Sequence, residues 1–324
     1  MTVQALFLPR PGENAPFELR EVPVPALRQG HVLVRVVAAG INPIDTKLRR
    51  SGGALLPDPA VLGADFAGRV EAVGEGVRDF ARGDAVYGCG GGVAGCPGGS
   101  LSECLLVDVD LVAPMPQSLS FREAAALPLV GLTAWEGLHR AGIHAGQRVL
   151  IRGGGGGVGH VAIQLARALG AEVAAVVRNP ERAPLVRTLG AQVLSLNDVR
   201  PDQWELVFDA AGTGSLDSLV AAARPAGHLV LISAEGAEQL AGAFRKALSI
   251  HYVFVVLPLI TGEGRAALGE ALRAIAALAD SGAVRPIVDP RRFGLNDAAQ
   301  AFAAVAQGDA QAKIVIDITE KEPR

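Results

Sequence analysis

Two patterns of apolar positions divide the chain. From Thr2 to about Phe80, short runs of alternating apolar and polar residues are separated by proline and glycine, as in HVLVRVVAAGI and FAGRVEAVG. Runs of this kind predict the strands of a small, mostly antiparallel, barrel-like domain. From about Arg122 to Ile260, β-type runs alternate with helical stretches. This alternation predicts a doubly wound parallel sheet and places the chain in the α/β class.

The change of pattern suggests where the domains begin and end. We expect a first domain over residues 1–121 and a second over residues 122–261. Ser120 with Glu123 three residues later matches the capping box, so a helix is expected to begin where the first domain closes. The last apolar run, AKIVIDI, has no partner in an α/β alternation, so we expect residues 262–324 to return to the first domain. Two domains also agree with a length of 324 residues, which is long for one core.

A glycine-rich turn lies between a β-branched strand and an amphipathic helix in VLIRGGGGGVGHVAIQLARALG. Its glycines give G-x-G-x-x-G in the strand–turn–helix setting that the dinucleotide fingerprint requires. Free N–H groups and the positive end of the dipole at the start of a helix favour a bound anion. The residues predicted to bind the cofactor pyrophosphate are Gly153, Gly154, Gly156, Gly157, Val158 and Gly159.

Two other interpretations of this turn are weaker. The phosphate-binding loop of nucleoside triphosphatases also begins G-x-x-x-x-G, but Lys and then Ser or Thr must follow, and here His160 and Val161 follow Gly159. A flexible glycine linker predicts polar flanks, whereas the flanks here are apolar and periodic. The dinucleotide interpretation therefore stands.

Arg178 indicates which nicotinamide cofactor is bound. NAD enzymes carry Asp or Glu about 20 residues after the glycines, where the carboxylate binds the ribose 2′-hydroxyl. In this chain Arg178 stands 19 positions after Gly159, and Arg182 follows one helical turn later. An arginine suits a 2′-phosphate because it forms charge-assisted hydrogen bonds. We therefore predict NADPH; the alternative is that both arginines are ordinary solvated charges.

Composition argues against several other classes of protein. The formal net charge is −3, so no electrostatic argument points to nucleic acid or to an anionic membrane. The longest apolar runs, such as Tyr252 to Ile260, are far shorter than the about 20 residues of a membrane span. The start shows no secretory signal, and three cysteines fit a reducing compartment without a disulfide framework. We expect a cytoplasmic protein that acts on a small molecule.

Several motifs in a fixed order carry a resemblance to one family. NPIDTKLRRSG, LGADFAGRVEAVGEGV, GDAVYG, LPLVGLTAWEGL, the glycine turn and AKIVIDI follow one another over nearly the whole chain. The chain resembles the medium-chain dehydrogenase/reductase superfamily, and within it the zinc-free quinone oxidoreductase branch that includes the zeta-crystallins. The resemblance implies a GroES-like β-barrel catalytic domain around an inserted Rossmann domain, with the active site in the cleft between them. It also implies a homodimer formed through edge strands near Val253 to Leu257.

The same resemblance implies that no metal is bound. The alcohol dehydrogenase branch has a catalytic Cys where this chain has Asn42, and a ligand His where it has Ala64. Neither residue is a ligand that zinc sites use, and no Cys or His lies near the expected third position around Leu129 to Gly131. The structural zinc lobe of the family needs four closely spaced cysteines, and this chain has three.

Without a metal, the reduction of a simple carbonyl lacks its electrophile. A quinone or an α,β-unsaturated ketone differs, since hydride added at the conjugated carbon sends charge to an oxygen that hydrogen-bond donors can stabilise. We therefore expect an NADPH-dependent reductase of quinones or activated enones. Two alternatives stay open: a zinc-independent alcohol or aldehyde reductase, and an NADPH-binding protein with low turnover and a crystallin-like or sensor role.

Four residues are candidates for contact with the reacting groups. By resemblance, Asn42 and Asp45 form a polar pair at the nicotinamide end of the cleft, and Pro43 predicts that both lie on a turn. The Asn42 amide could donate to an enolate or quinol oxygen, or hold the nicotinamide ribose. Thr133 matches a family threonine near the cofactor, and Lys47 stands where many relatives have Tyr and could donate to the reduced oxygen. The structural alternatives are a turn former for Asp45, a helix hydroxyl for Thr133 and a surface charge for Lys47.

Overall fold

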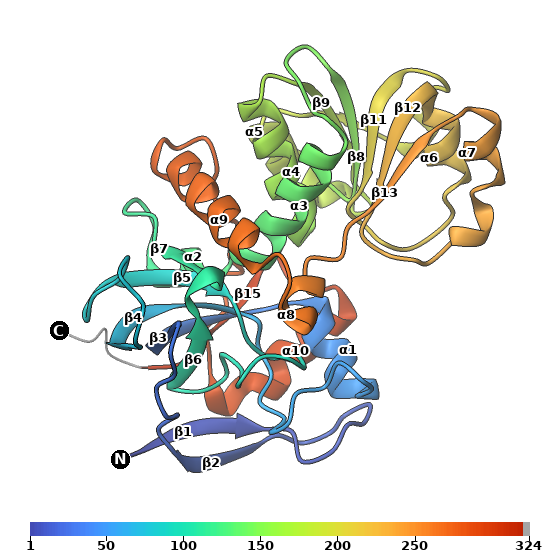
Figure 1. The fold of residues 1–324 in the computed structure, drawn as a ribbon. Helices are drawn as coiled ribbons and strands as arrows, with labels where there is room; N and C mark the ends of the chain where they lie inside the picture. The colour runs from blue at the N-terminus through green and yellow to red at the C-terminus, as the bar shows by residue number, and fades with distance from the viewer. Residues whose placement is uncertain (320–324) are drawn as a thin grey trace. The chain divides into compact units, whose positions relative to one another are not determined.

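The computed structural model describes residues 1–319 of the chain, which fold into two compact units (Figure 1). The first comprises Met1–Leu129, Val256–Gly282 and the chain from Pro286, and the second comprises Val130–Val255 and Ala283–Arg285. The domain boundaries proposed at residues 121 and 261 stay predictions, and residues 320–324 of the returning segment lie outside the described part. Within that part, no helix combines the length and the apolar character that a membrane crossing demands.

The second unit is built on a parallel sheet of six described strands. Its order, β10-β9-β8-β11-β12-β13, is the 3-2-1-4-5-6 order of a doubly wound dinucleotide-binding fold. The strands are β8 (Arg148–Arg152), β9 (Glu172–Val176), β10 (Gln192–Leu194), β11 (Trp204–Asp209), β12 (Ala223–Leu231) and β13 (Ser249–Tyr252). The helices are α4 (Gly157–Ala168), α5 (Ala183–Thr188), α6 (Asp217–Ala222) and α7 (Ala241–Arg245), with short 3-10 turns at Pro180–Arg182, Leu196–Asp198 and Ala237–Gln239.

The central strands of this sheet are apolar on both faces because helices cover both. Figure 1 shows α4 and α6 on opposite sides of the sheet. Val149, Leu150 and Ile151 of β8 are fully buried, and Leu150 shares a core cluster with Leu219 of α6. Continuous burial of this kind is what a parallel sheet between two helical layers requires.

The first unit contains a mainly antiparallel sheet in the order β14-β15-β3-β4-β5-β7, with β6 also paired to β3, and a separate β1–β2 pair. The strands are β1 (Thr2–Phe7), β2 (Glu18–Pro23), β3 (His31–Ile41), β4 (Asp65–Val73), β5 (Ala85–Cys89), β6 (Cys104–Asp108), β7 (Val112–Pro114), β14 (Phe293–Gly294) and β15 (Ile314–Asp317). The helices are α1 (Pro43–Ser51), α2 (Phe121–Ala125), α8 (Leu257–Thr261), α9 (Arg265–Asp280) and α10 (Ala298–Gln307), with 3-10 turns at Val109–Leu111 and Leu295–Asp297.

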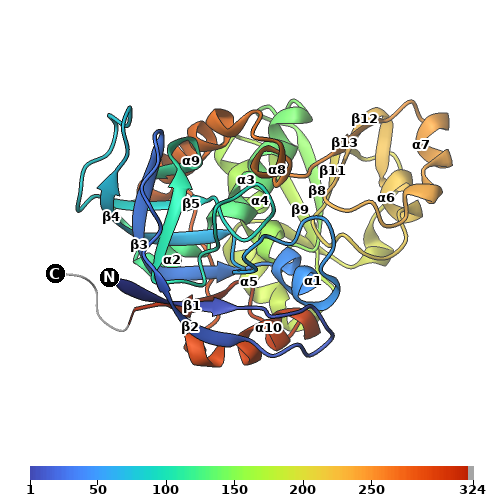
Figure 2. The ribbon, with the colours of Figure 1, turned by 60° about the horizontal axis from the view of Figure 1, so that its bottom comes forward.

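Segments from both ends of the chain meet in this unit. β15, the run AKIVIDI of the sequence, pairs antiparallel with β3, and Ile314 stands opposite Ile41. Figure 2 shows α10 close to β1 and β2. The Phe17 ring, just before β2, packs edge-on against Phe302 of α10 with ring centroids 4.9 Å apart.

The turn predicted around Pro43 was wrong, because the segment is the start of helix α1. Pro43 is the first residue of this helix, where a missing N–H costs nothing and the fixed φ suits the helix. The carboxylate of Asp45, in the first helical turn, accepts a hydrogen bond from the Asn42 N–H at 2.8 Å. The first turn of α1 therefore supplies the acceptor for the N–H group of the residue that precedes the helix.

Two further elements differ in extent from the sequence pattern. Helix α2 begins after Ser120 with both bonds of the capping box, as predicted, but a second helix, α3 (Pro128–Arg140), starts at Pro128. The edge strand β13 ends at Tyr252 rather than continuing through Val253 to Leu257. Helix α8 begins at Leu257 with a proline in its first turn, a position that suits proline because its N–H would have no partner within the helix.

Candidate active site

A buried polar cluster lies at one end of the first unit's sheet. Asn42 follows β3, Asp65 begins β4, Cys89 ends β5 and Lys313 precedes β15. These strands are neighbours in the order β15-β3-β4-β5 and run antiparallel. The start of one strand therefore lies beside the end of the next, and the four residues meet at the same end of the sheet. Asn42 and Asp65 are fully buried and Lys313 is only 3% exposed, so water does not solvate this cluster freely.

Hydrogen bonds fix the geometry of the cluster. Lys313 Nζ donates to Asn42 Oδ1 at 2.5 Å and to the Ile41 carbonyl oxygen at 3.0 Å. It also lies 3.4 Å from Asp65 Oδ2, an ion pair. Asn42 Nδ2 donates to Asp65 Oδ2 at 2.8 Å, and the Leu129 N–H donates to Asp65 Oδ1 at 2.8 Å. Both ends of the Asn42 amide are therefore engaged.

Asp45 adjoins this cluster, but its carboxylate binds backbone groups. Asp45 Oδ2 accepts the Asn42 N–H, and Oδ1 accepts the Gly63 N–H at 3.2 Å. Burial raises the pKa of Asp45 to about 7; the neighbouring Asp65 also raises it, whereas the two N–H donors and Lys313 act in the opposite sense. Burial likewise raises the pKa of Asp65, against the lowering effect of Lys313 and of its hydrogen bonds.

The other two predicted catalytic residues lie elsewhere. Lys47 is exposed on α1, and its ammonium has no hydrogen bond or ion pair with any residue of the described range 1–319. Thr133 is buried on α3, in the part of that helix that belongs to the second unit. The structure thus joins Asn42 and Asp45 and leaves Lys47 out of their hydrogen bonding. The chemical roles of Asn42, Asp45, Lys47 and Thr133 stay predictions.

In the second unit, the glycine turn connects the carboxyl end of β8 to the start of α4. Gly153 has a φ of +85°, which favours glycine, and the N–H groups of Gly153 and Gly154 both reach the Val176 carbonyl oxygen, at 2.9 and 3.2 Å. A Cβ on Gly159 would lie 2.1 Å from the Gly153 oxygen. The first N–H groups of α4 have no acceptor within a helix, so bare backbone and helix start together fit a pyrophosphate.

The two arginines predicted to bind a 2′-phosphate differ in their surroundings. Arg178 lies two positions after the end of β9 and is exposed. Arg182 is half-buried, and its Nη1 donates to the Gly155 carbonyl oxygen of the glycine turn at 2.8 Å. Both stand at the carboxyl end of the strand next to β8, where a doubly wound sheet binds the adenosine half of its ligand. Their contact with a cofactor stays a prediction.

An ion pair that we did not predict joins the adjacent strands β8 and β11. Arg152 and Asp209 are directly opposite in register, and the guanidinium makes two parallel bonds to the carboxylate at 2.8 and 2.7 Å. Asp209 also accepts the Ala211 and Gly212 N–H groups, and Arg152 donates to the Ser215 carbonyl oxygen. The pair therefore shapes the loop after β11 at the point where strand order reverses, which is the ligand crevice of such sheets.

Sequence signals for the missed residues exist. Arg152 and Asp209 each follow a buried run of three apolar residues, in VLIR and LVFD, and Asp65 and Lys313 each stand immediately before a buried apolar run. A charge next to a fully buried strand needs a partner, because an unpaired buried charge is costly. The sequence could have flagged all four as paired, but it could not say which pairs with which.

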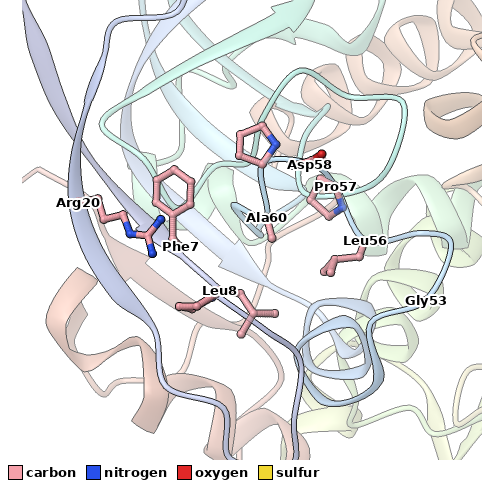
Figure 3. Close-up of a pocket in the computed structure, with 10 residues that line it drawn as sticks. Phe7, Leu8, Arg20, Gly53, Leu56, Pro57, Asp58 and Ala60 are labelled. Atoms are coloured by element: carbon pink, nitrogen blue, oxygen red, sulfur yellow. The ribbon is translucent and has the colours of Figure 1, made fainter.

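A separate hollow of about 530 Å³ opens on the surface of the first unit (Figure 3). It lies between β1, β2 and the loop from Gly53 to Ala60. Its one guanidinium, Arg20, is already paired with Glu18 and stacked over the Phe7 ring. None of the predicted site residues lines this hollow, so it is not where we expect the chemistry.

The donor set around Asn42 does not resemble a zinc site. By the resemblance described above, Asn42 and Ala64 stand where the alcohol dehydrogenase branch has its Cys and His ligands. The Cys89 thiol lies beside Asp65, and burial raises its pKa well above the usual range. Over residues 1–319, no three His, Cys, Asp or Glu side chains gather as metal ligands would. That the protein works without a metal stays a prediction.

Comparison with known proteins places the chain in a family. The family described as alcohol dehydrogenase GroES-like domain matches residues 28–117, and the family described as zinc-binding dehydrogenase matches residues 169–316. The chain is 36% identical to a 2-methylene-furan-3-one reductase of Solanum lycopersicum, over 91% of this chain and 74% of the relative. It is also 36% identical to a chloroplastic NADPH-dependent alkenal/one oxidoreductase of Arabidopsis thaliana, over 90% of this chain and 73% of the relative.

A solved structure agrees with these matches. The quinone oxidoreductase from Coxiella burnetii superposes with a TM-score of 0.82 at 27% identity, over 98% of this chain and all of that one. The match to this structure covers nearly the whole chain and so includes both the 3-2-1-4-5-6 sheet with its glycine turn and the antiparallel sheet that both chain ends complete. The chain therefore belongs to the medium-chain dehydrogenase/reductase superfamily, in its quinone oxidoreductase branch.

Proposed function

We propose that this protein reduces quinones or α,β-unsaturated ketones with NADPH and without a metal. The observation that carries the proposal is the bare glycine turn that starts α4 at the reversal point of a doubly wound sheet. The names of two relatives, a 2-methylene-furan-3-one reductase and an NADPH-dependent alkenal/one oxidoreductase, support the substrate class. The absence of Cys and His at positions 42 and 64 supports an acceptor that needs no Lewis acid.

NADPH, when bound, supplies a hydride from its nicotinamide ring. The acceptor gains this hydride at its conjugated carbon and a proton from solvent, and NADP⁺ is released, so atoms and charge balance. The first turn of α4, from Gly157 to Gly159, would hold the pyrophosphate by its N–H groups. Arg178 would take the 2′-phosphate, with Arg182 beside it. The preference for NADPH over NADH rests on these two guanidiniums.

Asn42 is the donor that we assign to the oxygen of the acceptor. Its amide carries two Nδ2 hydrogens, and only one is used, by Asp65. In the described part of the chain the second hydrogen has no acceptor. Asn42 has no exposed surface in this structure, so the acceptor reaches this hydrogen only after the residues around Asn42 move, and there it stabilises negative charge on an enolate or quinol oxygen. Asp45 then acts by holding the Asn42 backbone, and Thr133 by a contact to the cofactor. Lys47, exposed on α1, is the weakest of the four assignments.

One plate assay separates this function from its alternatives. NADPH oxidation is followed with 1,4-benzoquinone, 9,10-phenanthrenequinone, an alkyl vinyl ketone and a simple aldehyde. We expect turnover with the quinones or the vinyl ketone. Turnover with the aldehyde alone would favour a zinc-independent aldehyde reductase. Tight NADPH binding without turnover on any acceptor would favour a crystallin-like or sensor protein, and stoichiometric zinc in the purified protein would overturn the metal-free proposal.

We also propose that the protein is a cytoplasmic homodimer that pairs through β13. This strand is at the edge of the six-stranded sheet, and apolar rings near it are exposed: Tyr252 at 42% and Phe254 at 49%. An edge strand with exposed apolar neighbours is a template for pairing with a second copy. Light scattering should give twice the chain mass, and Ile250→Pro, which removes a backbone donor from the edge strand, should give the monomer. A monomeric wild-type protein would contradict the proposal.

A further inference from the structure

We propose that Lys313 and Asp65 are positioning residues for this reduction, because they hold the Asn42 amide in the one orientation that leaves an N–H to donate to the acceptor. The inference rests on the proposed function for its chemical meaning. Its structural basis is the cluster at the edge of the first unit's sheet, in which the three side chains are in mutual contact.

The orientation follows from which atoms can only donate and which can only accept. The Lys313 ammonium has no acceptor capacity, so the atom of Asn42 that faces it at 2.5 Å must be the carbonyl oxygen Oδ1. Ionised Asp65 has no donor capacity, so the atom that faces its Oδ2 at 2.8 Å must be Nδ2. A flipped amide would set donor against donor and acceptor against acceptor. The pair of opposite charges thus selects a single state of Asn42.

The backbone around Lys313 is held as firmly as its side chain. The Lys313 N–H donates to the Ile287 carbonyl oxygen at 3.1 Å, and the Lys313 carbonyl oxygen accepts the Asp289 N–H at 2.8 Å. The Asp289 carboxylate in turn accepts the Gln311 N–H at 2.8 Å. The neighbouring segment 287–289 therefore fixes the point from which the lysine side chain reaches toward Asn42.

Asp65 is fixed from its other side. Its Oδ1 accepts the N–H of Leu129, in the first turn of α3, where the helix dipole favours a negative charge. Its Oδ2 is left for Asn42 and Lys313. If the Asp65 carboxylate rotated away from Asn42, its Oδ1 would lose the hydrogen bond from the Leu129 N–H at the start of α3.

Stability alone does not account for this pair. Burying a lysine and an aspartate costs solvation that their attraction repays only in part, and apolar residues of similar volume are often as stable or more stable. The arrangement selects one amide orientation, which an apolar core could not do. A residue that acts through Asn42 has a signature that a merely stabilising residue lacks: its effect on turnover disappears when Asn42 is absent.

The test is a double-mutant cycle. Asn42→Ala, Lys313→Met and the double variant are compared with the wild type for kcat, for KM of NADPH and for KM of the enone. We expect Asn42→Ala to lower kcat by about 100-fold, as loss of one oxyanion donor does. Lys313→Met should lower kcat by about 10- to 100-fold with KM for NADPH changed less than about threefold, and the double variant should be no slower than Asn42→Ala. Losses that multiply, or a kcat unchanged in Lys313→Met, would overturn the inference.

Lys246→Met is the matched control for loss of a held ammonium. Lys246 Nζ donates to the carbonyl oxygens of Val220, Ala221 and Ala223 in the second unit, and it contacts no predicted site residue. Its removal should lower the unfolding midpoint without changing kcat. If Lys313→Met does not fold, Asp65→Asn, which keeps the shape and removes the charge, takes its place in the cycle with the same expectation and the same refuting outcome.

A readout without turnover separates this inference from the proposed function. In ¹⁵N spectra of wild-type protein, the Asn42 side-chain amide, assigned by its loss in Asn42→Ala, should give two sharp signals protected from solvent exchange. In Lys313→Met we expect those signals to broaden and exchange faster. Unchanged signals would refute the positioning role whether or not the wild type reduces an enone, whereas a wild type inactive on every acceptor would refute only the proposed function.

Discussion

Two glycines of the turn before α4 allow a test of cofactor binding against folding. Gly156 caps the helix with a φ of −89°, which any residue adopts, and the nearest atom to an added Cβ is the Gly153 oxygen at 3.3 Å. Gly156→Ala therefore needs only a shift of a few tenths of an ångström. The loss of a preferred cap residue and the gain in chain stiffness oppose each other, so we expect the free energy of unfolding to change by less than about 1 kcal/mol.

Gly159 is the matched variant with the opposite expectation. Its added Cβ would lie 2.1 Å from the Gly153 oxygen and 2.9 Å from the Gly154 Cα, and ordinary contact begins at 3.4 Å. The turn would have to move by about 1 Å against backbone, which is overpacking that costs about 1–3 kcal/mol or more. Gly159→Ala should therefore lower stability and, through the displaced turn, cofactor affinity as well.

Calorimetric titration with NADPH and urea unfolding, run on both variants, give the comparison. If the pyrophosphate lies against Gly156, its new methyl group should weaken binding by about 1–3 kcal/mol, which is about 5- to 150-fold in Kd, while the protein stays folded. Gly156→Ala with wild-type stability and wild-type NADPH affinity would refute the assignment of this turn to the cofactor. Equal loss of stability in both variants would refute the steric argument that separates them.

Three further outcomes follow from the structure. Arg178→Asp should raise the Kd of NADPH about tenfold or more and lower that of NADH in titrations of each, since it replaces a charge-assisted bond by repulsion; an unchanged ratio would refute the arginine assignment. The Asp289 carboxylate accepts three hydrogen bonds from Arg291, and mainly these bonds lower its pKa to about 2. The ionised carboxylate therefore stabilises the fold above pH 4, and this stabilisation is lost as the pH falls through 2. Asp289→Asn should thus cost about 1–2 kcal/mol in urea unfolding at pH 7 and much less near pH 2, with allowance for screening at the part-exposed Arg291. The pKa of Asp45, raised to about 7 by burial, means that this group favours the native state below pH 4 and loses that effect as pH rises through 7, so the stability difference between pH 5 and pH 8 should shrink in Asp45→Asn.

Elements with a strong local pattern were predictable. The glycine turn could be predicted because the strand, the run of glycines and the amphipathic helix that follows are all recognised from neighbouring residues. The helix start at Ser120 was readable for the same reason, since its two capping bonds join residues three apart. The helix at Pro43 was missed because proline and aspartate signal a turn and a helix start equally well.

The glycine turn by itself predicted a dinucleotide-binding fold. Residue identity at positions 42, 64 and 178, together with the family resemblance, predicted the lack of zinc ligands and a preference for NADPH, and these two stay predictions. Tertiary structure alone decided that Lys313 donates a hydrogen bond to Asn42, 271 positions away, and that Arg152 pairs with Asp209 on the adjacent strand. Such pairings depend on which strands become neighbours. Strand order is set by burial of the whole sheet, so no segment of the sequence holds that information by itself.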